Sequence, residues 1–243
     1  SMMRTLLITL SCILLAGTSL YGGTDWYEFS WMKEGRHIPK FAVLDTQSSL
    51  GPYAGQVKEI TLTDLVKFHG HPCDGLFIAA HGLSLAFGKL FPDGVIDRTD
   101  AYCITNNSPC FGDVAAYLSG GRIRFGSQKI RKELKQTFLI YRASTKQAVE
   151  VSLKKGVFPV SLKMLEDKIK AGRHKQEDIK KCQRLQWEFA KSLLAKPANE
   201  SFSVKVMDNF VWQADKYEHV GKRGDVLLKG KKELKGIGKV RIE

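Results

Sequence analysis

The first regular pattern of apolar and polar positions is a short segment followed by a long one. Residues 61–68 predict a short helix, with Thr61 or Thr63 as its N-terminal cap and Gly70 as its end. From about residue 74 to 90 the pattern predicts a long helix with one face of alanine, glycine and serine. Such small side chains allow another element to approach closely. Phe91-Pro92-Asp93-Gly94 then ends the helix and turns the chain.

The rest of the chain mixes strands and helices. The expected elements are a strand at 100–105, a helix at 109–118, a β-hairpin of strands at 136–142 and 147–153, and amphipathic helices at about 160–171 and 175–195. We therefore predict an α+β fold, in which a mixed sheet and packed helices form one core domain over residues 24–196. Beyond Lys196-Pro197, short β-prone runs rich in glycine and lysine predict a small, basic, β-rich appendage over residues 197–243.

The N-terminal segment has the proportions of a secretory signal. An uncharged apolar run follows Arg4, is too short to span a bilayer of about 20 residues, and leads into small residues. We interpret residues 1–23 as a signal peptide and expect an exported, periplasmic protein. An uncleaved membrane anchor is the alternative interpretation, although no basic residues follow the run.

The charge balance adds little about partners. The chain has 38 lysines and arginines against 25 acidic residues, a formal net charge of +13. The lysines are scattered along helices and turns without interleaved arginine and aromatic residues, so we expect no nucleic-acid partner. Weak contact with an anionic membrane surface stays open for an exported protein.

Four of the five cysteines lie after the apolar run, and an oxidising compartment would allow three pairings among them. Cys182 lies on an apolar helical stripe and Cys103 in a strand-like run, so both are expected in the core. Cys73 and Cys110 are left as the candidates for chemistry.

Reactive side chains gather in the stretch Phe68-His69-Gly70-His71-Pro72-Cys73-Asp74. Neither a helix nor a strand would bring His69, His71 and Cys73 together, whereas a loop bent at Gly70 can, and we expect two of the three to converge. Pro72 fixes the chain just before the long helix, which places Cys73 at the helix N-terminus, where unpaired N–H groups favour a thiolate.

The second cysteine loop has the same design. In Asn107-Ser108-Pro109-Cys110, Ser108 is the expected N-terminal cap, Pro109 the first helical residue and Cys110 part of the first turn. With His69, His71 and Cys73, Cys110 completes a set of nitrogen and sulfur ligands for zinc or another divalent transition metal. A Cys73–Cys110 disulfide is the rival interpretation.

These two loops, with the later Ser119-Gly120-Gly121 and Phe125-Gly126, resemble the FmdE-like family of formylmethanofuran dehydrogenase, whose pattern begins HGHxCPG, over about residues 60–155. The resemblance implies an α+β core, a homodimer, and a cleft that binds a metal, usually zinc. The cleft residues carried over by position are His69, His71, Cys73, Cys110 and Asp113. The chain departs from the pattern in having Asp74 for proline, Gly121 for a second cysteine, and no C-terminal cysteine cluster. Asp74 adds a carboxylate that could serve as a ligand or proton acceptor.

The predicted function is thus an exported, metal-binding protein with a His/Cys cleft, and whether it is an enzyme is left undecided. As an enzyme it would use a metal as Lewis acid or Cys73 as nucleophile, with His71 or Asp113 moving protons. As a carrier it would deliver a metal or a metal-containing cofactor to an exported oxidoreductase. A third interpretation assigns the work to the basic surface and leaves the cysteines structural.

Overall fold

The fold is organised around a five-stranded mixed sheet, seen in a computed structural model that describes residues 29–45, 56–213 and 215. Its strand order is β5-β4-β6-β7-β8. The strands are β4 (Ala101–Thr105), β5 (Gln128–Ile130), β6 (Thr137–Arg142), β7 (Gln147–Leu153) and β8 (Phe202–Met207). β4 and β5 are parallel and the other neighbours are antiparallel. The mixed sheet confirms the predicted α+β class.

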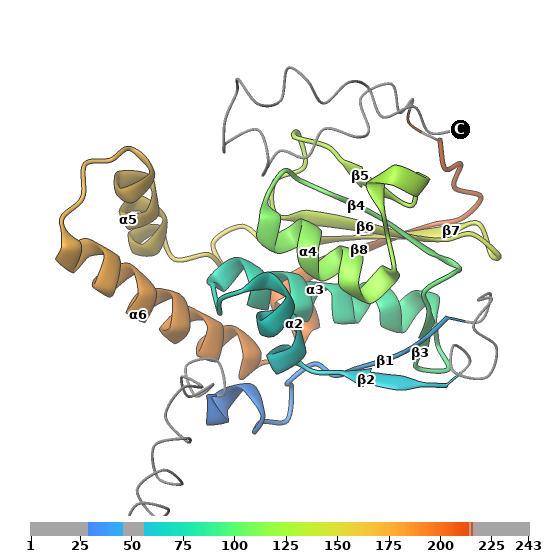
Figure 1. Cartoon of the computed structure of the whole chain (residues 1–243), viewed down its shortest axis with the longest axis horizontal. Helices are drawn as coiled ribbons and strands as arrows, with labels where there is room; N and C mark the ends of the chain where they lie inside the picture. Colours follow the sequence, from blue (N-terminus) through green and yellow to red (C-terminus); the bar gives the residue numbers. More distant parts are fainter. Residues whose placement is uncertain (1–28, 46–55, 214, 216–243) are drawn as a thin grey trace, which may run out of the picture.

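A smaller sheet lies on the opposite side of the helices (Figure 1). It has the order β2-β1-β3, formed by β1 (Phe41–Leu44), β2 (Lys58–Ile60) and β3 (Val95–Asp97). Phe41 of β1 packs against Phe87 of the long helix, with ring centroids 6.4 Å apart. The central helices therefore bury apolar surface against both sheets.

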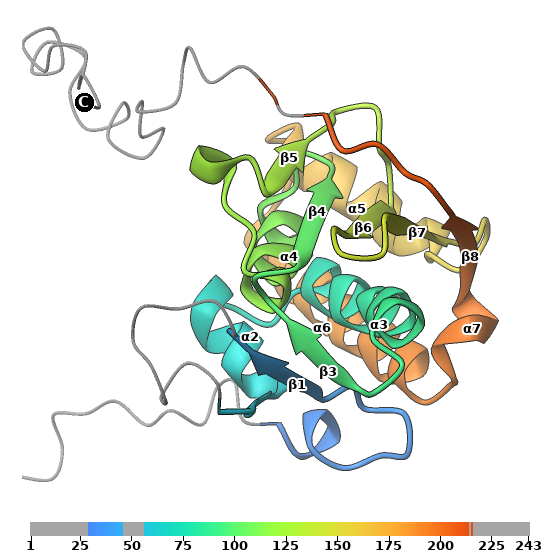
Figure 2. The ribbon, with the colours of Figure 1, turned by 90° about the vertical axis from the view of Figure 1, so that its right-hand side faces the viewer.

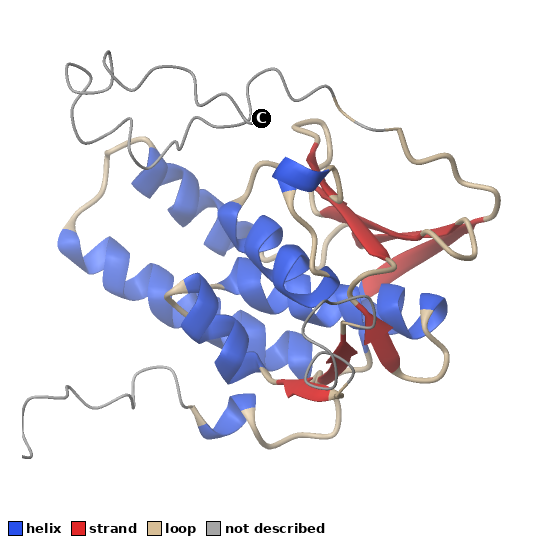
Figure 3. Cartoon of the chain, turned by 45° about the vertical axis from the view of Figure 1, so that its right-hand side comes forward, coloured by secondary structure: helices blue, strands red, loops and turns tan. Residues whose placement is uncertain are grey.

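Three helices lie between the sheets, and three more follow the hairpin. They are α2 (Leu62–His69), α3 (Asp74–Leu90), α4 (Pro109–Ser119), α5 (Val160–Lys170), α6 (Gln176–Leu194) and α7 (Ala198–Ser201). Two 3-10 turns, Ser30–Met32 and Ile123–Phe125, complete the described elements. Figure 2 shows α3 and α4 beside the large sheet, and Figure 3 shows how the helices gather on one side of it. The helices at 74–90, 109–118 and 160–171 were all predicted to within one residue.

The long helix α3 is the centre of the hydrophobic core. Eleven of its seventeen residues are buried, because its small residues let neighbours approach. At Gly82 an added Cβ would lie 2.7 Å from the ring of Phe202, the first residue of β8. The small-residue face predicted from the sequence is thus the seat of an aromatic ring from the far end of the chain.

The placement of β8 corrects the predicted domain boundary. The sequence assigned residues 202–206 to a separate appendage, but β8 pairs with β7 from Ala148↔Met207 to Leu153↔Phe202 and is the edge strand of the main sheet. The prediction was wrong here because the strand's exposed side is polar, whereas Phe202 is buried against α3. The later part of that appendage, residues 216–243, lies outside the described residues.

The predicted signal peptide, residues 1–23, also lies outside the described residues. Within the described ranges, no helix combines the length and the apolar character needed to cross a membrane.

Candidate metal centre

The first ligand loop is held between two well-defined helix ends. Thr61 caps α2 through a capping box with Asp64, and α2 ends at His69 because Gly70 adopts a left-handed conformation at φ 104°. The chain then needs only three residues to reach Cys73, which is the N-terminal cap residue of α3. This reversal brings the last residue of α2 next to the start of α3.

The second cysteine approaches from α4. Ser108 is the extended cap residue, Pro109 is the first helical residue and Cys110 is the second. The start of α4 can lie against the start of α3 because Gly75 has no side chain. A Cβ at Gly75 would be 3.0 Å from the Cβ and 3.2 Å from the Sγ of Cys110.

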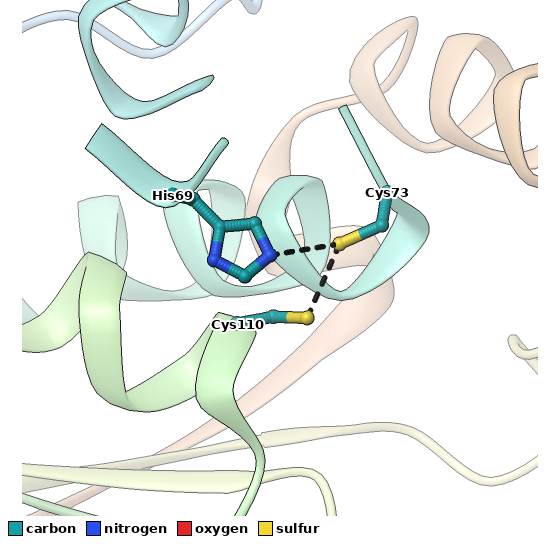
Figure 4. Close-up of side chains that lie close together, drawn as sticks. All are labelled: His69, Cys73 and Cys110. Carbon is teal, nitrogen blue, oxygen red and sulfur yellow. Dashed lines mark hydrogen bonds between the residues drawn. The ribbon is translucent and has the colours of Figure 1, made fainter. Parts of the chain in front are cut away.

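Three side chains converge where these elements meet (Figure 4). The Sγ of Cys73 lies 3.2 Å from the Sγ of Cys110 and 3.6 Å from the Nε2 of His69. The three possible ligand atoms all lie within 4.8 Å of one another. His69, Cys73 and Cys110 therefore form one group that could hold a metal ion.

A carboxylate fixes the orientation of His69. The Oδ2 of Asp113, one turn after Cys110 on α4, lies 2.8 Å from the Nδ1 of His69. The His69 side chain is only 3% exposed, whereas Asp113 is 42% exposed. With Nδ1 occupied, Nε2 is the ring nitrogen that faces the two sulfurs, as in a histidine ligand supported by a carboxylate.

The two thiols differ in their protonation. The pKa of Cys110 is lowered to about 6, first by the hydrogen bond that it accepts from the Cys73 thiol, with further contributions from His69 and Ser108. The pKa of Cys73 is raised, first because its proton is held by that hydrogen bond to Cys110 and then by burial. The pair thus holds one thiolate readily and shares the remaining proton.

His71 lies beside the group without joining it. Its ring centroid is 4.3 Å from that of His69 and its side chain is exposed. Its pKa is lowered, first by partial burial and then by the neighbouring His69. Of the three residues in the loop, His69 and Cys73 come together, and His71 faces the solvent next to them.

Asp74 points away from the sulfurs' contact and toward the helical pair α5 and α6. Its pKa is raised to about 7, first by burial and then by the negative charge of Glu166 on α5. It is not a member of the three-residue ligand group.

The other cysteines and the remaining histidine of α3 lie elsewhere. Cys103 and Cys182 are buried in the core, as predicted, and the four described cysteines are free thiols. His81 is buried, and its Nε2 lies 3.0 Å from the carbonyl oxygen of Lys196.

One supporting contact could not be expected from the sequence. The indole N–H of Trp187, on α6, donates a hydrogen bond of 2.9 Å to the carbonyl oxygen of Pro72. The two residues are 115 positions apart, so no local pattern connects them. Helix α6 therefore holds the loop that carries His71 and Cys73.

Comparison with known proteins agrees with this geometry. The family model described as "FmdE, Molybdenum formylmethanofuran dehydrogenase operon" matches residues 68–203. This chain belongs to that family. The matched region includes all three ligand residues and extends through α5 and α6 into β8.

Among solved structures, the chain is similar to an FmdE-like protein of tungsten formylmethanofuran dehydrogenase from Syntrophus aciditrophicus. The two are 17% identical, and the match covers 67% of this chain and 80% of the other, with a TM-score of 0.39. No curated protein matches this member of the FmdE family.

Proposed function

We propose that this FmdE-family protein is an exported zinc-binding protein whose ligands are His69 Nε2, Cys73 Sγ and Cys110 Sγ. The observation that carries the proposal is the convergence of these three atoms within 4.8 Å. Two of them belong to helix N-termini, where a thiolate is favoured.

The donor set and its dimensions fit zinc. Zinc binds thiolate sulfur at ~2.3 Å and imidazole nitrogen at ~2.0 Å, so tetrahedral ligand atoms lie roughly 3.5 to 3.8 Å apart. The observed separations of 3.6 Å and 3.2 Å need only a small widening between the sulfurs. Two soft sulfurs and one imidazole also exclude magnesium and calcium, which prefer oxygen ligands.

The residues around the ligands have separate roles in this proposal. Asp113 holds His69 in the tautomer that presents Nε2, and Gly75 lets Cys110 approach Cys73. Three protein ligands leave one tetrahedral position for an outside ligand. A bound ion would supply Lewis acidity there, and His71, exposed beside His69, is the nearest side chain that can exchange a proton with a molecule at that position.

A carrier function is supported better than a catalytic one. No groove described in the structure is lined by His69, Cys73 or Cys110, whereas an enzyme's ligand site is usually a concave pocket. An incomplete ligand set close to the surface suits transfer of a metal, or of a metal-containing cofactor, to a partner such as an exported oxidoreductase.

Metal analysis tests the proposal. Protein purified without chelator or added metal should contain close to one zinc ion per chain, measured by inductively coupled plasma mass spectrometry. Metal-free protein that also fails to take up zinc on addition would contradict it, and a Cys73–Cys110 crosslinked peptide in the fresh protein would favour the disulfide.

Export rests on the apolar run after Arg4. Expressed in a bacterium with its native N-terminus, the protein should appear in the periplasmic fraction shortened by about 16 to 23 residues, as read by intact-mass measurement. Full-length protein in the cytoplasm would contradict export.

A further inference from the structure

Helices α5 and α6 form an antiparallel hairpin that projects from the sheets (Figure 1). Beyond Leu162, α5 buries no residue, although it carries Val160 and Met164 one turn apart. Their exposed fractions are 73% and 68%. A helix that exposes apolar residues at i and i+4 presents an apolar stripe without a partner.

A groove of ≈ 660 Å³ runs between the two helices. Its apolar floor is formed by Met164 and Leu165 of α5 and by Leu185 of α6. On α6 the lining extends from Asp178 to Leu185, two helical turns or ~10 Å. The groove therefore has the length to receive a helix of about two to three turns.

The rim of the groove is positively charged. It carries Lys168, Arg173 and Lys181. Lys168 is neutralised by Asp178, whose Oδ2 lies 2.7 Å from the Lys168 Nζ. Arg173 and Lys181 form no ion pair within the described ranges. Residues 160–196 as a whole contain twice as many basic as acidic residues.

We infer that this groove docks an acidic amphipathic helix of a partner protein. An apolar floor between basic rims matches a helix with an apolar stripe and flanking carboxylates. A second copy of the same hairpin would bring like charges together. A membrane surface contacts projecting residues, whereas Leu165 and Leu185 are partly buried at the bottom of the groove.

The position of the groove links it to the metal centre. Leu185 lines the groove, and Trp187, two residues further along α6, hydrogen-bonds to Pro72 in the ligand loop. A helix seated in the groove would lie on the same element that holds this loop. The inference rests on the proposed carrier function for its purpose, but its physical basis is independent of the metal.

A defined peptide tests the docking. The probe is a fluorescein-labelled, terminally blocked 15-residue peptide with leucines at i, i+3, i+4 and i+7 repeats and glutamates at the exposed positions. Fluorescence anisotropy with the full chain should show saturable binding. The same peptide with lysine in place of glutamate, and a scrambled peptide that loses the stripe, should each bind at least tenfold more weakly.

Matched variants locate the site. Lys181→Glu and Met164→Glu should each weaken binding by at least tenfold. Lys180→Glu makes the same charge change on the neighbouring exposed residue outside the groove, and should change binding by less than threefold. Zinc content, measured in parallel, should be the same in all three variants, so failure of the docking can be told apart from failure of the metal site.

Three outcomes would overturn the inference. They are equal weakening by Lys180→Glu and Lys181→Glu, tighter binding to anionic phospholipid vesicles that Met164→Glu abolishes while the peptide fails to bind, and self-association that Lys181→Glu abolishes.

Discussion

At the scale of single residues, the geometry of the candidate site depends on which atoms are already occupied. His69 has its Nδ1 against Asp113, so only Nε2 is available to the sulfurs. The Cys73 proton is directed at Cys110, which lowers the pKa of the Cys110 thiol to about 6. Each of these contacts prepares a ligand atom before a metal arrives.

Asp74 gives a residue-scale prediction for pH. Its pKa rises from 3.8 to about 7 on folding, because burial and Glu166 disfavour the charged carboxylate. The stability that it contributes is therefore present below about pH 4 and lost as the pH rises through about 7. Asp74→Asn keeps the shape and removes the charge, so it should stabilise the protein at pH 8 and have little effect at pH 4.

Thermal unfolding of the chelator-treated protein and the variant measures this difference. Each pH unit between the folded and unfolded pKa corresponds to ~1.4 kcal/mol, so the gain at pH 8 amounts to at most about 4 kcal/mol. A variant that is equally stabilised at both pH values, or destabilised at pH 8, would contradict the assignment.

At the scale of elements, the sequence predicted the helices and strands well because their signals are local. The capping box of α2, the Pro109 start of α4 and the β6–β7 hairpin each depend on neighbouring residues. The same local signals placed both cysteines at helix N-termini. The contact between those two ends depends on Gly75 and on a chain reversal at Gly70, and spacing alone cannot show that two helix ends meet.

The close approach at Gly75 gives the element-scale prediction. Gly75→Ala would place a methyl group 3.0 Å from the Cys110 Cβ, so the start of α4 must shift by a few tenths of an ångström. We expect this shift to lower zinc affinity about tenfold, as changes next to ligands commonly do. Competition with a chromophoric chelator measures the affinity.

Gly88→Ala is the control on the same helix. An added Cβ at Gly88 meets nothing within 4 Å, and alanine favours a helix interior by up to ~1 kcal/mol over glycine. It should leave zinc affinity unchanged and raise the melting temperature slightly. If both alanine variants have the same zinc affinity, the close packing of α3 and α4 does not control the site.

At the scale of the whole molecule, contacts between distant segments decide the arrangement. Phe202 of β8 packs onto Gly82, and Trp187 of α6 binds the ligand loop at Pro72. The sequence could not predict either contact, since each joins residues more than a hundred positions apart. This is why β8 was wrongly assigned to an appendage, and why the role of α6 behind the metal centre was not foreseen.

The central claim is that His69, Cys73 and Cys110 share one metal ion, and zinc content across cysteine variants tests it most directly. Cys73→Ser and Cys110→Ser should each lose most of the bound zinc, because each removes one of three ligands. Cys182→Ser, which changes a buried cysteine outside the group, should keep the full content of the unmodified protein. Full zinc content in both Cys73→Ser and Cys110→Ser would contradict the account.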